Sequence, residues 1–227
     1  MSFSLTRRAD ISIYLIVSFS YHSGYTRVRR RPPDRTETDM AMTQEKNDLL
    51  TQTGQDTPMG RLLRQYWVPA IRSSALEADG PPVKVRLFGQ EFIAFRATDG
   101  RVGFIDEACP HRGVSLALGR NEENGVLCIF HGWKVDVTGA VVDAPCEPAA
   151  RREKFCASIR TRRYSAFESC GVVWVFVGIG TPPPFPNFEF HGLPDGHVSI
   201  RRAVVHYNWL QGVEAHIDSS HVPILHR

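Results

Sequence analysis

The sequence has little that would place the protein in a membrane or on a nucleic acid. No apolar run is long enough to cross a bilayer as a helix, and the stretch at residues 11–19 is too short. Beyond residue 41 the charges balance, with 20 basic and 20 acidic residues, so that part has no positive surplus. The net charge of +3 arises within residues 1–41, which hold seven arginines, no lysine and four acidic residues. We therefore predict neither a membrane nor a nucleic-acid partner.

Cysteine is scarce as well. The five cysteines are Cys109, Cys128, Cys146, Cys156 and Cys170. An odd number argues against a disulfide framework, and thiols in a reducing compartment serve as metal ligands or stay free. We therefore expect a cytoplasmic protein, with free thiols at Cys146, Cys156 and Cys170.

Residues 1–41 differ from the rest of the chain. Arg7 and Arg8 precede the apolar stretch, and an arginine-rich tail follows it. This order resembles a short secretory signal, but the A-x-A-like cleavage site of such signals is missing. We expect residues 1–41 to be a disordered or spurious N-terminal extension, with Met42 as the alternative start.

The next two regions differ in their periodicity. Residues 42–65 predict two helices, one over 43–50 and a second that begins at Thr57-Pro58, an N-cap followed by proline at the first helical position. Residues 66–180 predict a small antiparallel β domain. Its expected strands are 83–87, 92–95, 102–105 and 172–177, with a hairpin turn at Asp99-Gly100.

Residues 181–227 predict a linker and part of a further domain. The proline-rich segment 181–186 should be stiff. A strand is expected over 198–207 and a helix over 208–220, which Pro223 should end.

Two short motifs carry the strongest chemical signal. Cys109-Pro110-His111 and Cys128-Ile129-Phe130-His131 each offer one thiolate and one imidazole, and 16 residues separate His111 from Cys128. A Rieske 2Fe–2S centre needs two cysteines on one iron and two histidines on the other. Two loops that clasp the cluster between them can supply this set.

Other interpretations of these motifs stay open at this point. The pairs could pack in a core by chance. Two sulfur and two nitrogen ligands also suit tetrahedral zinc, although zinc sites more often use C-x2-C and H-x3-H pairs. A c-type haem needs C-x-x-C-H, which the sequence does not contain.

A second constellation lies near the end of the chain. Glu214, Asp218 and His221 follow i, i+4, i+7 spacing, which places them on one helix face. His226 can return toward that face after Pro223. Two imidazoles and a carboxylate suit a non-haem Fe(II) facial triad. A polar helix face or an opportunistic metal site is the alternative, and His216 is expected to be a surface or supporting histidine.

The two cysteine-histidine motifs resemble the Rieske family. Respiratory Rieske proteins carry an extra cysteine in each loop, and those two form a disulfide; Val114 and Phe130 stand at these places here. Trp133 after His131-Gly132 resembles the oxygenase branch. The resemblance implies a 2Fe–2S cluster held by Cys109, His111, Cys128 and His131, at the low end of the Rieske range of potentials.

The C-terminal constellation resembles the D-x2-H-x4-H motif of Rieske non-haem iron oxygenases. The resemblance implies that His221 and His226 bind a mononuclear Fe(II) and that Asp218 is the bridging carboxylate between subunits. The implied relay runs from His131 to Asp218 of a neighbour and on to His221. A trimer-based homo-oligomer is expected, because this relay crosses subunits.

Further motifs resemble the phthalate 4,5-dioxygenase group. They are Thr57-Pro58-Met59-Gly60, Tyr66-Trp67, Pro145-Cys146-Glu147-Pro148 and the segment 171–176. The expected fold is mainly β: a Rieske-type antiparallel β domain with N-terminal helices, followed by the start of a truncated α+β catalytic domain. Family members supply the third iron ligand from further downstream.

The resemblance implies the oxygenase component of an aromatic-ring dioxygenase system used in aromatic hydrocarbon catabolism. An NADH-dependent flavin or ferredoxin reductase would supply electrons. The iron would activate O2 to hydroxylate, or O-demethylate, a small aromatic and carboxylated substrate. The alternatives are a stand-alone Rieske ferredoxin-like electron carrier and an inactive truncated fragment.

Overall fold

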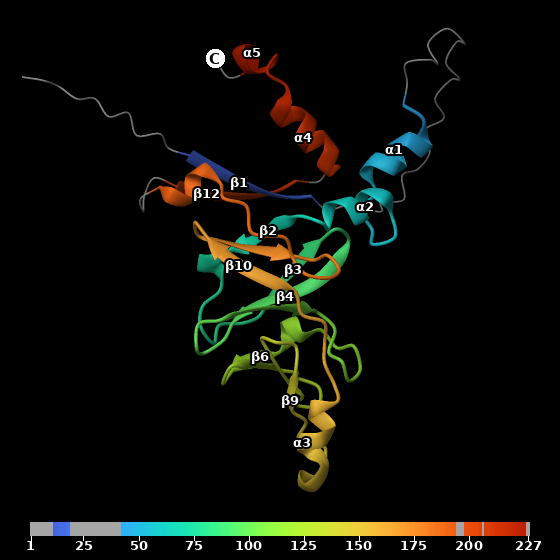
Figure 1. Cartoon of the computed structure of the whole chain (residues 1–227), viewed down its shortest axis with the longest axis vertical. Coiled ribbons are helices and arrows are strands. Elements are labelled where there is room, and N and C mark those ends of the chain that lie inside the picture. The colour runs from blue at the N-terminus through green and yellow to red at the C-terminus, as the bar shows by residue number, and fades with distance from the viewer. Residues whose placement is uncertain (1–10, 19–41, 194–197, 206, 226–227) are drawn as a thin grey trace, which may run out of the picture.

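The computed structural model describes residues 11–18, 42–193, 198–205 and 207–225, and the described chain is elongated (Figure 1). The strands are β1 (Ile11–Ser18), β2 (Trp67–Arg72), β3 (Val83–Leu87), β4 (Gln90–Arg96), β5 (Val102–Asp106), β6 (Arg120–Glu122), β7 (Gly125–Leu127), β8 (Lys134–Asp136), β9 (Val141–Asp143), β10 (Ser165–Ser169), β11 (Val172–Phe176) and β12 (Val198–Val205). The helices are α1 (Gln44–Thr51), α2 (Pro58–Leu63), α3 (Ala149–Ala157), α4 (Trp209–Ile217) and α5 (Val222–Leu225).

Three antiparallel sheets build the β part of the molecule. Their strand orders are β10-β11-β2, β3-β4-β5 and β6-β7-β8-β9. In Figure 1 the four-stranded sheet and α3 occupy one end of the long axis, while α4 and α5 occupy the other. The prediction of a mainly β, antiparallel fold with N-terminal helices is confirmed.

Local sequence signals explain most of these elements. The Thr57 hydroxyl accepts a hydrogen bond from the Gly60 N–H at 3.1 Å, and Pro58 occupies the first helical position of α2. The alternation at 83–87 produces β3, and Gly100 turns the chain between β4 and β5 with a φ of 88°. β11 is buried along its whole length because it lies between β10 and β2.

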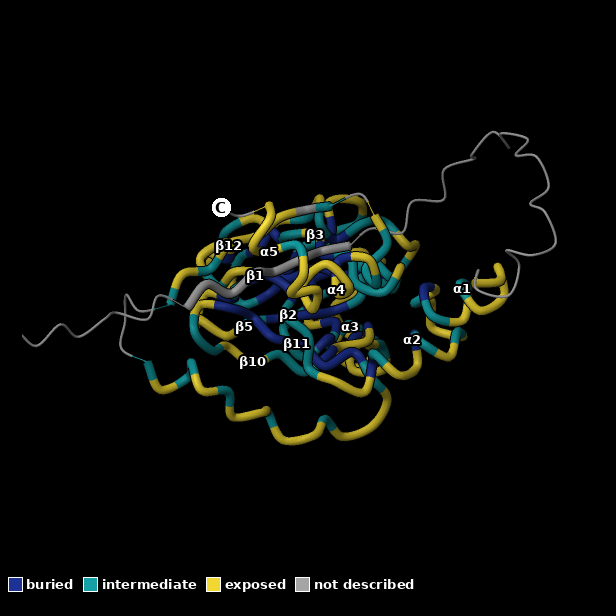
Figure 2. Tube along the Cα trace, turned by 90° about the horizontal axis from the view of Figure 1, so that it is seen from above, coloured by how far each residue is buried: buried dark blue, intermediate teal, exposed yellow. Residues whose placement is uncertain are grey.

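Strand β4 connects two hydrophobic cores. Phe92 and Ala94 point into one core, which also contains β11, while Ile93 and Phe95 point into the other. This division follows from the alternation of side chains along a strand. The second core continues to the ends of the two cysteine-histidine loops, and Figure 2 shows that buried residues concentrate in these strands.

The predicted stiff linker has no helix or strand over residues 182–188, and it is packed against the β part. The Trp67 indole N–H donates to the Pro183 carbonyl at 2.8 Å. The Phe185 ring lies edge-on to Trp67 and Trp174, with centroids 5.5 and 5.6 Å apart. The aromatic contacts therefore fix the path of the chain toward β12.

The C-terminal helix differs from its prediction. α4 ends at Ile217 instead of reaching Ser220, because the Asp218 carboxylate accepts the Ser220 N–H at 2.8 Å and draws the backbone out of the helix. Pro223 does not end this helix. It lies in the first turn of α5, where its missing N–H costs no hydrogen bond.

The N-terminal stretch also differs from its prediction. The segment 11–18, expected to belong to a disordered or spurious extension, forms β1 and pairs in parallel with β12. The other residues of 1–41 lie outside the described chain, so the division into domains stays a prediction. Among the described residues, no helix has the length and apolarity required to cross a bilayer.

Candidate metal centre

The two cysteine-histidine loops share one backbone design. In the first loop the Cys109 N–H donates to the Val114 carbonyl at 2.9 Å, and in the second the Cys128 N–H donates to the Trp133 carbonyl at 2.8 Å. Each cysteine carbonyl then accepts an N–H from a glycine four residues later, at 2.9 and 3.0 Å. The loops are therefore two copies of the same turn, although the histidine follows the cysteine at different spacings.

Both glycines are required by this turn. Gly113 and Gly132 have φ values of 72° and 71°, in the left-handed region that side chains disfavour. A Cβ at Gly132 would lie 2.8 Å from the Pro145 ring, whereas a Cβ at Gly113 would meet nothing within 4 Å. The second loop is thus held by a close neighbour as well as by its own turn.

The two thiols form a buried pair. Cys109 and Cys128 both belong to the core below the loops. Burial raises the pKa of the Cys109 thiol, which also shares a hydrogen bond with Cys128. A metal that binds this pair must therefore displace protons, as thiolate ligands always require.

The two imidazoles form a second pair nearer the surface. The His111 and His131 rings lie edge to face with centroids 4.6 Å apart. His111 stacks on the Trp133 indole at 4.5 Å with an interplanar angle of 6°, and Phe130 lies 4.1 Å from His131. Desolvation and the neighbouring His131 lower the pKa of His111, which favours the neutral ring that a metal needs.

The four predicted side chains pair like with like. The thiols form one pair and the imidazoles another, so the loops offer two sulfur donors on one side and two nitrogen donors on the other. Within the described chain, no three His, Cys, Asp or Glu side chains form a group that would hold one metal ion. Two donors of each kind match the division of ligands between the irons of a Rieske cluster.

A third segment supports these loops. The Cys146 thiol donates to the His131 carbonyl at 3.7 Å, and Glu147 is close enough to His111 to influence its charge. Trp133 also meets Phe155 of α3 edge-on at 5.5 Å. The sequence alone predicts no partner for Cys146. Its place beside Pro145 in a motif of the phthalate group was the only signal that could have found it.

The second constellation is only partly assembled. The His221 ring nitrogen Nδ1 lies 3.2 Å from Asp218 Oδ2. A hydrogen bond from the Ser220 N–H lowers the pKa of Asp218, and a hydrogen bond with His221 makes a smaller contribution in the same direction. Because α4 ends at Ile217, His221 does not share a helix face with Glu214, which corrects the predicted spacing argument.

Two further histidines belong to this region of the sequence. His226 lies outside the described residues, so its predicted role as a ligand stays a prediction. His216 forms its own contact, 2.6 Å from Nδ1 to the Gly212 carbonyl oxygen within α4. Its predicted supporting or surface position is consistent with this local contact.

The two candidate sites lie at opposite ends of the molecule's long axis. The loops adjoin α3 through Trp133 and Phe155. Figure 1 shows α3 at one end of the long axis, and α4 and α5 at the other. Side chains of one copy therefore cannot join the two sites directly.

Comparisons with known proteins agree with these features. The model of the Rieske [2Fe-2S] domain matches residues 66–163. The 3-chlorobenzoate-3,4-dioxygenase oxygenase subunit of Comamonas testosteroni is 44% identical over 188 residues, which is 82% of this chain and 43% of that protein. The phthalate 4,5-dioxygenase oxygenase subunit of Pseudomonas putida is 43% identical and covers 82% of this chain and 42% of its own.

A more distant curated relative and a solved structure also match the chain. The 5,5'-dehydrodivanillate O-demethylase oxygenase subunit of Sphingobium is 34% identical over 80% of this chain and 43% of its own. A crystal structure of dicamba monooxygenase with non-heme iron and dicamba shares the fold, with a TM-score of 0.51 and 24% identity over 59% of this chain and 40% of that one. The present chain spans less than half the length of the curated relatives it matches.

Proposed function

We propose a function from the premise that this chain belongs to the Rieske non-haem iron oxygenases that hydroxylate aromatic rings. It carries the Rieske [2Fe-2S] domain of that family. Its proposed role is that of an oxygenase component, in which this domain receives electrons for a reaction at a separate mononuclear iron. The alternative of a stand-alone electron carrier is less well supported, because the similarity to oxygenase subunits continues beyond the Rieske domain to 82% of the chain.

The pairing of like side chains carries the proposal. Cys109 and Cys128 would hold one iron of the cluster, and His111 and His131 would hold the other. The bound cluster would supply one-electron transfer. Trp133 stacks on the His111 ring and keeps it in a fixed plane. The Cys146 thiol donates a hydrogen bond to the His131 carbonyl and so restrains the backbone of the second loop. Such supporting contacts orient ligands and adjust their donor strength.

His221 and His226 are the proposed protein ligands for the mononuclear Fe(II). Asp218 holds the His221 ring through Nδ1, which fixes the proton there and the lone pair on Nε2, the nitrogen that would face a metal. Asp218 is also the proposed bridging carboxylate toward His131 of a neighbouring subunit. The separation of the two sites within one copy supports a relay that crosses between subunits, for which we propose a trimer-based assembly.

The proposed substrate is a small aromatic carboxylate, with O2 as the second substrate. Two of the relatives are named for 3-chlorobenzoate and phthalate, which both carry carboxylates, and a third is named for an O-demethylation. An NADH-dependent flavin or ferredoxin reductase is the proposed electron donor. A cytoplasmic location is supported by five cysteines that form no disulfide in the described chain.

The test is metal analysis of the full chain purified without oxygen. We expect two irons and two acid-labile sulfides per chain, a Rieske EPR signal after reduction, and a further Fe(II) on titration. His221→Asn should abolish binding of the further Fe(II), whereas the matched variant His216→Asn should retain it. Absence of sulfide, or one zinc ion in place of iron, would contradict the cluster. Fe(II) binding that His221→Asn leaves intact would contradict the second site.

A further inference from the structure

A basic pocket outside both metal sites is lined by three arginines. It has a volume of about 660 Å³ and lies between α2, the start of the linker and β4. Arg61, Arg64 and Arg162 line it together with Phe176 and Ile179. We call this site the arginine pocket. Its size falls in the range of small-molecule sites.

Arg64 is a buried cation that is held by neutral groups. It is only 7% exposed. Its guanidinium donates to the carbonyls of Thr53 at 2.8 Å, Gly60 at 3.0 Å and Phe88 at 3.2 Å. Burial lowers the pKa of Arg64, and the charge of Arg162 contributes in the same direction. These contacts fix the side chain, and Arg64 forms no ion pair with a carboxylate among the described residues.

The other two arginines are held in a similar way. Arg61 donates to the Asp56 backbone carbonyl at 2.8 Å, and Arg162 lies over the Tyr164 ring with its central carbon 5.1 Å from the ring centroid. Within the described ranges, no carboxylate forms an ion pair with any of the three. The Asp56 side chain also lines the pocket, so the local charge is three positive against one negative.

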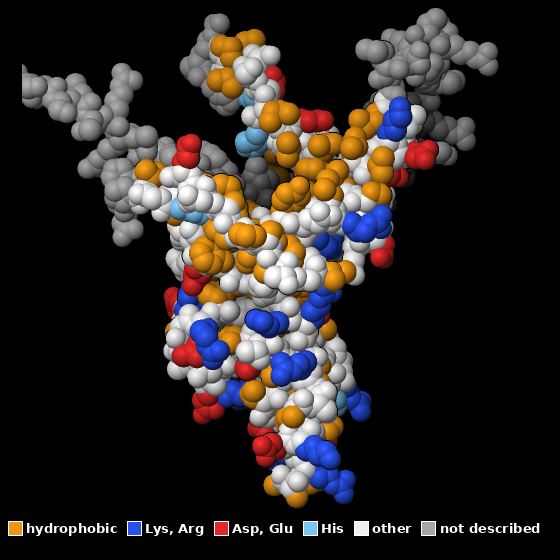
Figure 3. Space-filling model, viewed as in Figure 1, with side chains coloured by type: hydrophobic (Ala, Val, Ile, Leu, Met, Phe, Trp, Pro, Cys, Tyr) orange, Lys and Arg blue, Asp and Glu red, His pale blue; other side chains and the backbone are white. Residues whose placement is uncertain are grey.

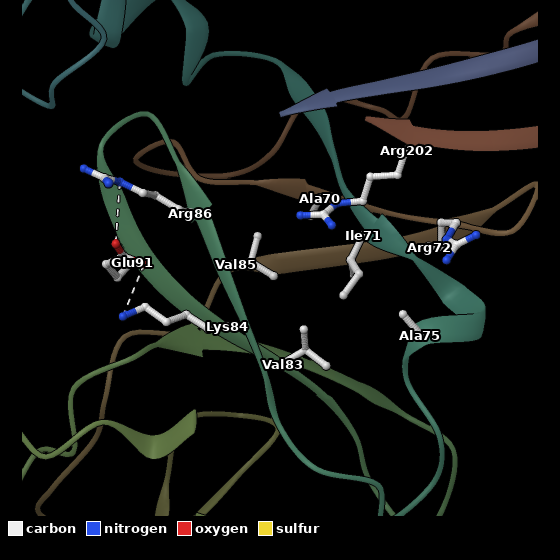
Figure 4. Close-up of a pocket in the computed structure, with 10 residues that line it drawn as sticks. All are labelled: Ala70, Ile71, Arg72, Ala75, Val83, Lys84, Val85, Arg86, Glu91 and Arg202. Carbon is white, nitrogen blue, oxygen red and sulfur yellow. Dashed lines mark ion pairs between the residues drawn. The ribbon is translucent and has the colours of Figure 1, made fainter. Parts of the chain in front are cut away.

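A second pocket is also lined by several cations. It has about 470 Å³, and its lining includes Arg72, Lys84, Arg86 and Arg202 (Figure 4). Lys84 and Arg86 both pair with Glu91, at 3.6 and 3.5 Å, and Lys84 also pairs with Glu107 at 3.0 Å. Acidic side chains therefore neutralise Lys84 and Arg86, whereas Arg72 and Arg202 form no ion pair within the described residues. Across the same described ranges, none of the three cations of the arginine pocket is neutralised in this way.

We propose that the arginine pocket binds a small organic carboxylate with an apolar body. Guanidinium groups bind carboxylates through two parallel hydrogen bonds, and a site from which water is partly excluded strengthens them. Phe176 and Ile179, with Val177 and Pro183, supply an apolar wall for the rest of the ligand. Binding here is independent of both metal sites, so its failure would leave the proposed function untouched.

The test is equilibrium dialysis of radiolabelled benzoate against the full chain with its cluster loaded. We expect one saturable site per chain. Cyclohexanecarboxylate should displace benzoate, while benzamide, which lacks the charge, and inorganic phosphate, which lacks the apolar body, should not. Arg61→Gln and Arg162→Gln should each weaken binding about tenfold or more.

Arg163→Gln is the matched control, because Arg163 is an exposed neighbour of Arg162 that does not line the pocket. It should leave benzoate affinity unchanged. Far-UV circular dichroism and the cluster absorbance establish that each variant is folded. If Arg162→Gln fails to fold, Arg61→Gln remains as the second pocket variant, because Arg61 is exposed. Unsaturable binding, equal displacement by benzamide or phosphate, or full affinity in both pocket variants would overturn the proposal.

Discussion

The loop end and the α4–α5 end of the molecule differ in how they are stabilised. At the loop end, repeated backbone hydrogen bonds, stacked rings and a buried core fix the four proposed ligands. At the α4–α5 end, large apolar side chains are exposed, including Ile217 at 75% and Leu225 at 73%. Figure 3 shows hydrophobic side chains gathered on this end and between α4 and the N-terminal helices.

This difference teaches which site the described chain can preorganise. Ligands on a rigid scaffold keep their geometry before a metal binds. The loop end meets this condition by itself, whereas Asp218 and His221 lie between two short helices that contain few buried residues. We therefore expect the same kind of substitution to have a larger effect at the loop end than at the α4–α5 end.

The largest effect is expected from loss of a thiol ligand. Cys128→Ser should abolish the Rieske EPR signal and most bound sulfide, because a hydroxyl at this place cannot replace a thiolate toward iron. The control is Cys170→Ser, which keeps a hydrogen-bond donor toward the Phe190 carbonyl and lies away from the loops. A full signal in Cys128→Ser, or its loss in Cys170→Ser, would contradict the ligand set.

Core substitutions should separate the two ends next. Phe95→Ala removes a fully buried ring from the core below the loops and should lower the free energy of unfolding by about 3–5 kcal/mol. Ile217→Ala on α4 should change it by less than about 0.5 kcal/mol. Urea denaturation followed by circular dichroism measures both. Similar losses in the two variants would show that the ends are equally packed.

The two loop glycines offer a matched pair. Gly113→Ala should cost about 1 kcal/mol of stability, from the positive φ alone. Gly132→Ala should cost more and reduce cluster occupancy, because its Cβ would also lie 2.8 Å from the Pro145 ring. Thermal unfolding and sulfide content provide the comparison. Equal costs would mean that the Pro145 segment moves aside freely.

The smallest effects are expected for ion pairs. Arg96 holds Glu168 through two hydrogen bonds of 2.6 and 2.9 Å, which joins β4 to β10, so Glu168→Gln should cost about 1 kcal/mol. Arg96 lowers the pKa of Glu168 below its ordinary value of 4.5. The carboxylate therefore stabilises the fold above that pH, and its contribution is lost as the pH falls through the folded-state pKa.

The exposed pair at the other end is the control for this prediction. Asp218→Asn should produce no measurable change in unfolding at neutral pH, because the Asp218 side chain is 47% exposed and its partner His221 is partly exposed. The difference in urea midpoint between the wild-type chain and Glu168→Gln should be largest at pH 7. It should shrink as the pH falls below 4.5, and vanish once the pH is below the folded-state pKa of Glu168. A difference between them that persists at low pH would mean that Glu168 acts through packing and not through charge.

The sequence predicted features that depend on a few neighbouring residues. Thr57 and Pro58 define the start of α2 because capping is local, and the cysteine-histidine motifs are short loops. Features that depend on distant residues could not be derived. The stacking of His111 on Trp133 and the contact of Cys146 with His131 join different loops. The early end of α4 reflects competition by the Asp218 side chain, which a helical spacing pattern does not reveal.

The most direct test of the ligand assignment is electron-nuclear double resonance on the reduced full chain with 15N-labelled histidine. We expect hyperfine couplings from two histidine nitrogens. In a His131→Cys chain that retains a cluster, we expect one coupling to be lost and no new nitrogen signal to arise. Two couplings would place His111 and His131 on one iron. A cluster without histidine couplings, or a chain that binds metal without sulfide, would contradict the central claim.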